Sequence, residues 1–279
     1  MHFGRTKQIP DIELALPALT DRTAKLMTLP WEGKRRLYVG CPIFSEEQWL
    51  GSFYPEGMKK NQFLHHYAQS FDTVEVNSTF YSLPNLGMIR GWYQKVPVHF
   101  RFCPKVFKGI SHEFASGKWR QHVEAFWQGM LAFQDKLGLV FMQLPEWVGP
   151  NMWGPIKEFL KTKPPSCSLA VEFRQKDWFQ DHRLFDHVVD DLYRLGCFTV
   201  ITDTLGRRET LHMSLTGAKV CVRFLGCLES PVDKRRLDEW GALLKIWRES
   251  LDEVYFFVHH EDHLKIPPMT AYVQKVIQH

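Results

Sequence analysis

Residues 71–84 of this 279-residue chain read FDTVEVNSTFYSLP, and this stretch decides the fold. Its alternation places the polar residues Thr73, Glu75 and Asn77 on one face of an extended segment, with the valines between them on the other. β-branched residues favour a strand, and Pro84 ends the extended run. A carboxylate and an amide are costly to bury without partners. They therefore either tie down the next loop or belong to a polar site, and both readings stay open.

Further motifs occur in order along the chain. They are Trp49–Pro55 (WLGSFYP), Phe100–Phe102 with Lys105, Ile110–His112, Gln143–Pro145, Val171–Arg174 with Trp178, and Val222–Phe224. With residues 67–84, this set resembles the signature of the domain-of-unknown-function 72 family, also called YecE-like, across residues 37–265. The resemblance implies a TIM-barrel-like fold related to the endonuclease IV and xylose isomerase group. It implies no settled reaction.

Apolar strand-like runs alternate with amphipathic helical runs from residue 37 onward, which is typical of repeated βα units around a parallel sheet. The expected strands are Leu37–Cys41, Thr73–Asn77, Phe100–Lys105, Leu139–Gln143, Ser168–Arg174, Phe198–Asp203, Lys219–Phe224 and Val254–His259. They predict one α/β domain, a (β/α)8 TIM-like barrel over residues 37–279, after an N-terminal extension at residues 1–36. Within the extension we expect a helix over Asp21–Leu29, capped by Thr20 or Asp21. The loop Leu205–Gly217 shows no firm helix.

Composition narrows the class of protein. Hydrophobic residues make up 44% of the chain, which is enough for a substantial core and excludes global disorder. The formal net charge of +4 permits an anionic partner but is small for a dedicated nucleic-acid binder. The six cysteines form no C-x-x-C pair, so we expect no disulfide and no structural zinc. Without a leader-like segment or a long apolar run, the sequence predicts a cytoplasmic protein with no membrane partner.

Polar residues gather at the ends of the expected strands, where TIM barrels carry their active sites. Strand alternation turns the following residues inward: Glu75, Asn77, Arg101, Lys105, Gln143, Glu172, Arg174, Asp203, Arg223 and His259. Such a concentration at one end predicts a pocket. Simpler roles stay open for three of them. Glu172 can pair with Arg174, Gln143 can satisfy loop amides, and Asp203 can cap a turn.

Loop residues add further candidates. His112 is included because of the family resemblance, and Trp49, Tyr81 and Trp178 are candidates for stacking on a sugar or a base. His259–His263 (HHEDH) contains metal-binding residue types. Its spacing is not the i, i+4 pattern of a helical zinc site, and strand alternation separates its first two histidines. We therefore expect no metal at this cluster, while a divalent metal as cofactor stays an alternative.

Three segments depart from the family pattern at the expected site. The first strand ends in Gly40–Phe44 (GCPIF) where the family has a Gly-Ser-Gly-Trp-like turn. Leu225 occupies the place of a histidine, and His259–Asp262 replaces an Asn-rich strand end. A changed ligand and a loss of activity are both compatible with these departures.

The leading hypothesis is an enzyme acting on an anionic, phosphorylated or sugar-like substrate, as a hydrolase, an isomerase or a lyase. Glu75, Glu172 and Asp203 are the candidate acid/base groups. The candidate substrate-binding residues are Asn77, Tyr81, Lys105, His112, Gln143, Arg174, Trp178, Arg223 and His259, of which Lys105, Arg174 and Arg223 would hold the anion. A nucleic-acid-binding or repair-associated protein is the alternative, with the basic runs Lys34–Arg36 and Arg207–Arg208 as contacts. A non-catalytic scaffold is the third hypothesis.

Overall fold

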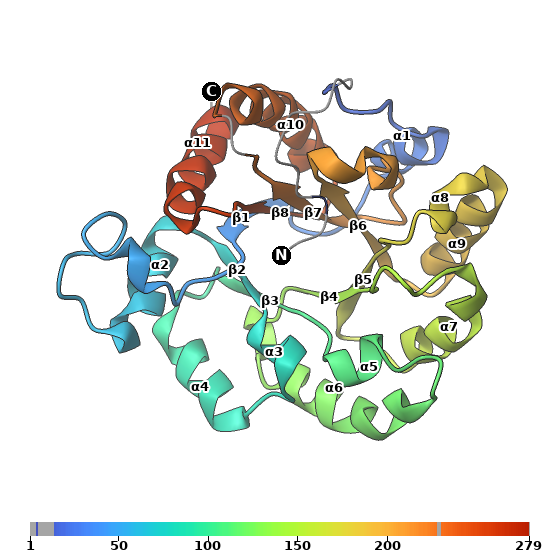
Figure 1. Cartoon of the computed structure of the whole chain (residues 1–279), viewed down its shortest axis with the longest axis horizontal. Helices are drawn as coiled ribbons and strands as arrows, with labels where there is room; N and C mark the ends of the chain where they lie inside the picture. The colour runs from blue at the N-terminus through green and yellow to red at the C-terminus, as the bar shows by residue number, and fades with distance from the viewer. Residues whose placement is uncertain (1–3, 5–13, 228–229, 279) are drawn as a thin grey trace.

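The computed structural model describes residue 4, residues 14–227 and residues 230–278. Its eight strands are β1 (Arg36–Cys41), β2 (Thr73–Val76), β3 (Arg101–Pro104), β4 (Leu139–Gln143), β5 (Ser168–Glu172), β6 (Phe198–Asp203), β7 (Lys219–Leu225) and β8 (Glu253–His259). All paired strands run parallel, in the order β3-β2-β1-β8-β7-β6-β5-β4. In Figure 1 the strands form a ring with helices outside it. The predicted α/β barrel and its strands are thus confirmed.

The barrel closes where β3 meets β4. Two backbone hydrogen bonds join this seam, from the Gly138 amide to the Phe102 carbonyl (2.8 Å) and from the Val106 amide to the Phe141 carbonyl (2.9 Å). The remaining neighbours along the sheet pair through continuous ladders. The sheet is therefore a nearly closed barrel rather than an open, twisted layer.

Helices follow the strands and cover the outside of the barrel (Figure 1). They are α1 (Asp21–Met27), α2 (Phe63–Ser70), α3 (Ser78–Tyr81), α4 (Leu86–Lys95), α5 (Lys108–Ser111), α6 (Val123–Leu131), α7 (Trp153–Lys161), α8 (Asp177–Gln180), α9 (His182–Arg194), α10 (Ser230–Ser250) and α11 (Ile266–Gln278). After β6 the chain forms only a 3-10 helix, Leu205–Thr210, as the lack of a helical pattern predicted. None of the described helices is both long and apolar enough to cross a membrane.

Inward-facing side chains form layers inside the barrel. The lower layers are apolar and aromatic: Tyr38, Cys103, Leu139, Phe141, Ala170, Val200, Cys221, Tyr255 and Phe257. Two residues further along the same strands, the inward positions are Lys105, Gln143, Glu172, Thr202, Arg223 and His259. Because side chains alternate along a strand, the apolar layers support a polar layer at the carboxyl end of the barrel.

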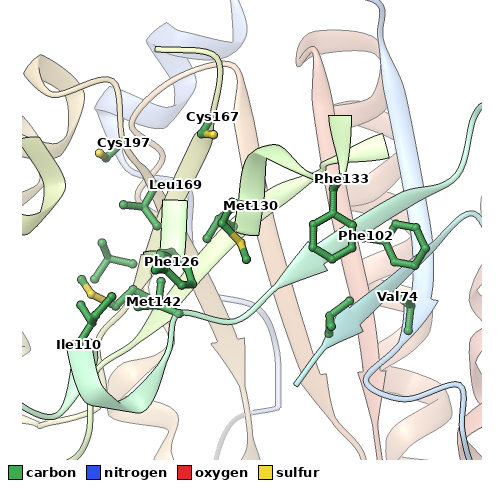
Figure 2. Close-up of a cluster of buried hydrophobic side chains, with 14 of the residues drawn as sticks. Val74, Phe102, Ile110, Phe126, Met130, Phe133, Met142, Cys167, Leu169 and Cys197 are labelled. Carbon is green, nitrogen blue, oxygen red and sulfur yellow. The ribbon is translucent and has the colours of Figure 1, made fainter. Parts of the chain in front are cut away.

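Outward-facing side chains pack between the sheet and the helices. Figure 2 shows part of this layer, where Val74 and Phe102 of the sheet lie near Phe133, and Met142 lies near Phe126. All six cysteines carry free thiols, and five of them are buried. The apolar layer fixes the strands and so fixes the positions of the side chains at their ends.

The segment before the barrel docks on its wall. Helix α1 is capped by Thr20, whose hydroxyl accepts the Thr23 amide (3.2 Å), and it ends two residues before the predicted limit. The fully buried Thr23 hydroxyl donates to the Met213 carbonyl (2.6 Å) and accepts the Leu215 amide (2.9 Å). These contacts attach the segment to the loop after β6. The division at residue 36 stays a prediction.

Candidate active site at the barrel mouth

Arg223 lies at the centre of the polar layer and is completely buried. Its guanidinium contacts Glu75 through two hydrogen bonds, from Nε to Oε1 (2.7 Å) and from Nη2 to Oε2 (3.2 Å). It also donates from Nη1 to Oε2 of Glu172 (2.7 Å), and both carboxylates are buried. One strand-end arginine therefore bridges two carboxylates from β2 and β5.

A second chain of contacts leads from Glu172 to the two other cations. Arg174 donates its Nε to Oε1 of Glu172 (2.8 Å), and the Gln143 amide donates to Oε2 of the same carboxylate (2.8 Å). The Lys105 Nζ donates to Oε1 of Gln143 (2.7 Å). Lys105 and Arg174 are thus joined through one amide and one carboxylate.

Glu75 has two further partners. His259 Nε2 lies 3.1 Å from its Oε1, and the Asn77 amide lies 3.3 Å from its Oε2 while also donating to the Pro42 carbonyl (2.9 Å). Eight of the predicted site residues therefore form one hydrogen-bonded group, which we call the mouth cluster: Glu75, Asn77, Lys105, Gln143, Glu172, Arg174, Arg223 and His259.

Both carboxylates of the mouth cluster are ionised at neutral pH. Burial alone would raise the pKa of Glu75, but the charges of Arg223 and His259 outweigh it and hold that pKa well below its ordinary range. Burial opposes ionisation of Glu172 too, and Arg174 and Arg223 together hold its pKa equally low. Each carboxylate already accepts hydrogen bonds on both oxygens, which suits an anchor for neighbouring cations better than a proton donor.

Lys105 is the member of the cluster whose pKa lies near neutrality. Burial lowers the pKa of this amine from 10.5 to about 7, and the charges of Arg223 and Arg174 act in the same direction. The carboxylates Glu75 and Glu172 oppose the change but do not cancel it. At neutral pH a substantial fraction of the Lys105 side chain is therefore an uncharged amine.

A cavity of about 460 Å³ lies directly above the mouth cluster. Asn77, Lys105, Gln143, Arg174 and His259 line it from the strand ends. Residues of the loops, of α3, of the end of β7 and of the start of α11 complete the lining: Gly4, Pro42, Ile43, Phe80, Tyr81, Thr204, Leu205, Leu225, Gly226, Cys227, His260, Glu261, His263 and Ile266. The cavity has the size of a small-molecule site and opens at the carboxyl ends of the strands, as predicted.

Asp203 is a correction to the prediction. In the register of β6 with β7, Thr202 pairs with Arg223 and Asp203 pairs with Phe224, so Asp203 faces outward. Its carboxylate accepts hydrogen bonds from Trp240 (2.8 Å) and Arg208 (2.7 Å) instead of entering the mouth. The inward residue at this height is Thr202. An acid/base role for Asp203 in the cavity is therefore wrong.

Two aromatic predictions and one basic prediction also fail. Trp178 is fully buried and donates its indole N–H to the Val148 carbonyl (2.9 Å), so it belongs to the core. Trp49 is likewise buried and donates to the His263 carbonyl (2.8 Å). Arg101 begins β3 and contacts the ring of Tyr38, so it lies at the opposite end of the barrel.

The remaining predictions lie at the rim. Tyr81 lines the cavity and is 67% exposed. His112 does not line it, but its ring lies 5.2 Å from Phe80 and 5.2 Å from Trp147, and its Nδ1 lies 2.9 Å from the Ser111 hydroxyl. Partial burial and the charge of Lys105 lower the pKa of His112, so it is neutral at physiological pH.

Sequence reasoning placed Tyr81 and three departing segments at the expected site, but it did not single out the other residues that line the cavity. Phe80 is the most consequential, because its ring centre lies 4.0 Å from the Lys105 Nζ. The Thr79-Phe80-Tyr81 motif was a signal that this loop mattered, but the sequence did not say which ring points inward. His260 bonds the Cys227 carbonyl (2.6 Å), whereas His259 bonds Glu75, so the two histidines face different partners.

The donor set does not fit a metal centre. Both carboxylates of the mouth cluster already accept hydrogen bonds from arginine on both oxygens, and Glu172 also accepts one from the Gln143 amide. Across residues 14–227 and 230–278, no group of three or more His, Cys, Asp or Glu side chains is arranged to hold an ion. The HHEDH segment accordingly does not converge on one point.

The family described as "Protein of unknown function DUF72" matches residues 38–279. The UPF0759 protein YecE of Escherichia coli K12 is 25% identical over 251 residues, which cover 84% of this chain and 89% of YecE. The UPF0759 protein YunF of Bacillus subtilis is 23% identical over 150 residues, covering 51% of this chain and 52% of YunF. YecE is similar to this chain over most of its length, and YunF is similar over about half of it.

Solved structures are similar in fold. The crystal structure of a DUF72 family protein from Enterococcus faecalis V583 superposes with a TM-score of 0.71 at 18% identity, covering 88% of this chain and 96% of that one. A DUF72 family protein from Thermotoga maritima MSB8 gives a TM-score of 0.70 at 22% identity, covering 87% and 99%. With the family match over residues 38–279, they confirm the resemblance seen in the sequence, and this chain belongs to the DUF72 family.

Proposed function

We propose that this protein is an enzyme that binds a small anionic substrate, phosphorylated or sugar-like, in the cavity at the barrel mouth. The observation that carries the proposal is the pair of cations on one wall of that cavity. Lys105 and Arg174 both line it, and only 6% and 8% of their surfaces are exposed. Cations so shielded from water attract a bound anion more strongly than surface cations do.

The charge balance of the cluster supports an anion. Glu75 and Glu172 contribute two buried negative charges, and Arg223 and Arg174 contribute two positive ones. Protonated Lys105 brings the buried total to +1. Glu261 also lines the cavity, but it is exposed, so water and salt screen its charge. A bound monoanion would complete the balance.

The two buried carboxylates hold these cations in place. Glu172 contacts Arg174 and Arg223, while Glu75 contacts Arg223 and His259. Neither carboxylate lines the cavity. Arg174, one of the cations that they orient, does line it. Preorganised cations of this kind bind planar or tetrahedral oxyanions with defined geometry. A direct acid/base role for Glu75 or Glu172 stays a prediction.

Calorimetric titration with inorganic phosphate and with glycerol 3-phosphate tests the proposal. We expect saturable binding that weakens with added salt, and about tenfold or greater weakening in Arg174→Ala, because a charge-assisted hydrogen bond is lost. Arg248→Ala is the matched control. Arg248 is in the last turn of α10, at the far end of the barrel from the cavity, where it contacts Glu249.

Arg248→Ala should bind phosphate like the unaltered protein. If Arg174→Ala also binds both ligands unchanged, the anion site is not at Arg174. If the unaltered protein binds neither ligand at any salt concentration, the proposed substrate class is wrong.

The nucleic-acid hypothesis receives less support from the two basic runs on which it relied. Arg208 donates to Asp203 and to the Leu14 and Ala15 carbonyls, and Arg207 pairs with Glu146 and Glu209. The run at residues 34–36 leads into the start of β1, so it lies at the opposite end of the barrel from the cavity. Arg207 lies beside the mouth, where its Nη2 donates to the Arg174 carbonyl (2.9 Å), but its guanidinium is paired with Glu146 and Glu209.

A further inference from the structure

Lys105 differs from an ordinary buried lysine in what surrounds its amine. Its Nζ donates to Oε1 of Gln143 (2.7 Å) and lies 4.0 Å from the centre of the Phe80 ring. Among the described residues, no carboxylate lies within 4.0 Å of this nitrogen. An ammonium has three donors, so a single acceptor and an aromatic face leave this one poorly satisfied.

Lys136 is the internal comparison. It is equally buried, at 6% exposure, but its Nζ donates to the carbonyls of both Tyr93 and Val96 at 2.7 Å. Those contacts make Lys136 a tie between backbone segments. The Lys105 amine contacts no backbone carbonyl, and it lines a cavity that Lys136 does not reach. Its position is that of a reactive group.

We propose that the Lys105 Nζ is a nucleophile that forms an imine with the carbonyl carbon of an aldehyde or ketone bound in the cavity. The inference rests on the proposed function, which it deepens: the substrate class becomes a small anionic carbonyl compound, such as a sugar phosphate in its open-chain form. Lysine amines that lose their charge in buried sites form Schiff bases of this kind.

The atoms of the step balance without a further reactant. The nitrogen lone pair forms the C–N bond, and one N–H proton passes to the carbonyl oxygen to give a carbinolamine. The C–O bond then breaks, and the oxygen leaves as water with the second N–H proton. Once its nitrogen takes up a proton, the resulting C=N bond withdraws electrons from the adjacent carbon, which is the activation used by lyases and isomerases that work through a Schiff base.

The cluster gives the step its geometry. The contacts Lys105–Gln143–Glu172–Arg174 fix the amine and the guanidinium on one wall of the cavity. An anionic group on Arg174 therefore points the rest of a short substrate toward Lys105. Phe80 covers the amine and limits its contact with water, and burial is also what brings the pKa of Lys105 to about 7.

Reductive trapping tests the inference. The protein is incubated at pH 7 with glycolaldehyde phosphate and sodium cyanoborohydride, and the adduct is located by intact-protein and peptide mass spectrometry. We expect one dominant adduct on Lys105, formed at least roughly tenfold faster than on any other lysine, because an unshifted amine is almost wholly protonated at pH 7. Its rate should rise between about pH 6 and 8, then level off.

Matched variants distinguish loss of the reactive amine from misfolding of the protein. Lys108→Met removes an exposed lysine next to the site and should leave the Lys105 adduct unchanged, whereas Lys105→Met should abolish the dominant adduct. Lys136 in the unaltered protein serves as the buried control and should stay unmodified. An adduct distributed over surface lysines, with Lys105 no faster than the rest, would overturn the inference.

Unphosphorylated glycolaldehyde separates this inference from the proposed function. Fast labelling of Lys105 by the phosphorylated probe only, lost in Arg174→Ala, supports both. Equal labelling by both probes supports the imine and counts against the anion site. Phosphate binding in calorimetry without any Lys105 adduct leaves the proposed function standing and refutes the nucleophile.

Discussion

The protein contains two buried ionic clusters that share β6 and β7 as a boundary but face opposite sides of the barrel wall. The mouth cluster surrounds Arg223 inside the barrel. The second, which we call the wall cluster, lies outside and consists of Asp203, Arg208, Arg236, Asp233 and Trp240. Arg236 contacts Asp203 (2.9 Å) and Asp233 (3.1 Å), and Arg208 and Trp240 also donate to Asp203.

The difference between the clusters is what lies next to them. The wall cluster is packed between the sheet and α10, and Arg208 ties it to the carbonyls of Leu14 and Ala15. None of its members lines the cavity, whereas Lys105 and Arg174 of the mouth cluster do. A buried ion pair is thus no sign of a functional site by itself. A buried cation that borders a cavity is a much stronger sign.

The largest effect we expect is on stability, from Arg223→Met. The substitution leaves two buried carboxylates without their shared cation, so the free energy of unfolding should fall by about 3–5 kcal/mol. Arg236→Met should cost less, about 2 kcal/mol, because Arg208 and Trp240 still contact Asp203 and the Cys227 amide still contacts Asp233. Urea unfolding followed by tryptophan fluorescence measures both.

The same pair of variants separates the clusters by function. Arg236→Met should bind phosphate like the unaltered protein, because the wall cluster does not reach the cavity. A larger loss of stability in Arg236→Met than in Arg223→Met would show that the wall cluster, not the mouth cluster, is the less redundant of the two.

The next prediction is a gain in stability, whereas the previous two were losses. Lys105→Met should raise the free energy of unfolding at pH 7 by an amount on the order of 2 kcal/mol, because it removes a buried amine whose protonation burial opposes. Its folded pKa of about 7 lies below the ordinary 10.5, so the unfolded chain binds the extra proton between those values. The contribution of Lys105 to the stability of the unaltered protein should therefore rise from about pH 7 to about pH 10.5.

Lys136→Met is the control for the predicted gain in stability, because here we expect a loss. It leaves the buried carbonyls of Tyr93 and Val96 without their donor and should lower stability by about 1–3 kcal/mol. Unfolding curves at several pH values between 6 and 10 compare the two variants. If Lys105→Met is destabilising throughout and leaves the pH dependence unchanged, Lys105 is a structural lysine like Lys136.

Strand alternation explains which inward-facing positions the sequence predicted correctly and which it did not. Glu75, Glu172 and Arg223 were placed correctly because each follows an apolar run whose phase is clear. On β6 both Thr202 and Asp203 precede the loop, and the sequence alone favoured the charged one. Only the register with β7 shows that Thr202 pairs with the inward Arg223.

Other features of the site depend on distances that no sequence pattern contains. The pKa of Lys105 depends on its burial and on the charges of Arg223, Glu172 and Arg174, which come from other βα units. Aromatic residues near strand ends were equally ambiguous. Trp178 is in the core and Tyr81 is at the rim, although both follow strands within motifs of the same family. The helix after β6 was correctly not expected, because residues 205–217 lack an apolar period.

The smallest effect we expect on stability is from Tyr81→Ala, at most about 0.5 kcal/mol, because the side chain is 67% exposed. The substitution should instead weaken the binding of ligands that carry a sugar ring. Tyr81 lines the cavity and its ring lies 5.1 Å from that of Phe80, next to Lys105, so it offers a face to a sugar ring bound beside the anion. Affinity for glucose 6-phosphate should fall several-fold, while affinity for inorganic phosphate should not change.

Tyr81→Phe keeps the ring and loses only the hydroxyl, so it should retain most of the affinity for glucose 6-phosphate. Calorimetric titration of both ligands into both variants gives the four affinities needed for the comparison. If Tyr81→Ala weakens the two ligands equally, the ring acts on the anion site and not on a sugar. If it weakens neither, the substrate lies entirely beneath the rim, against the wall formed by Lys105 and Arg174.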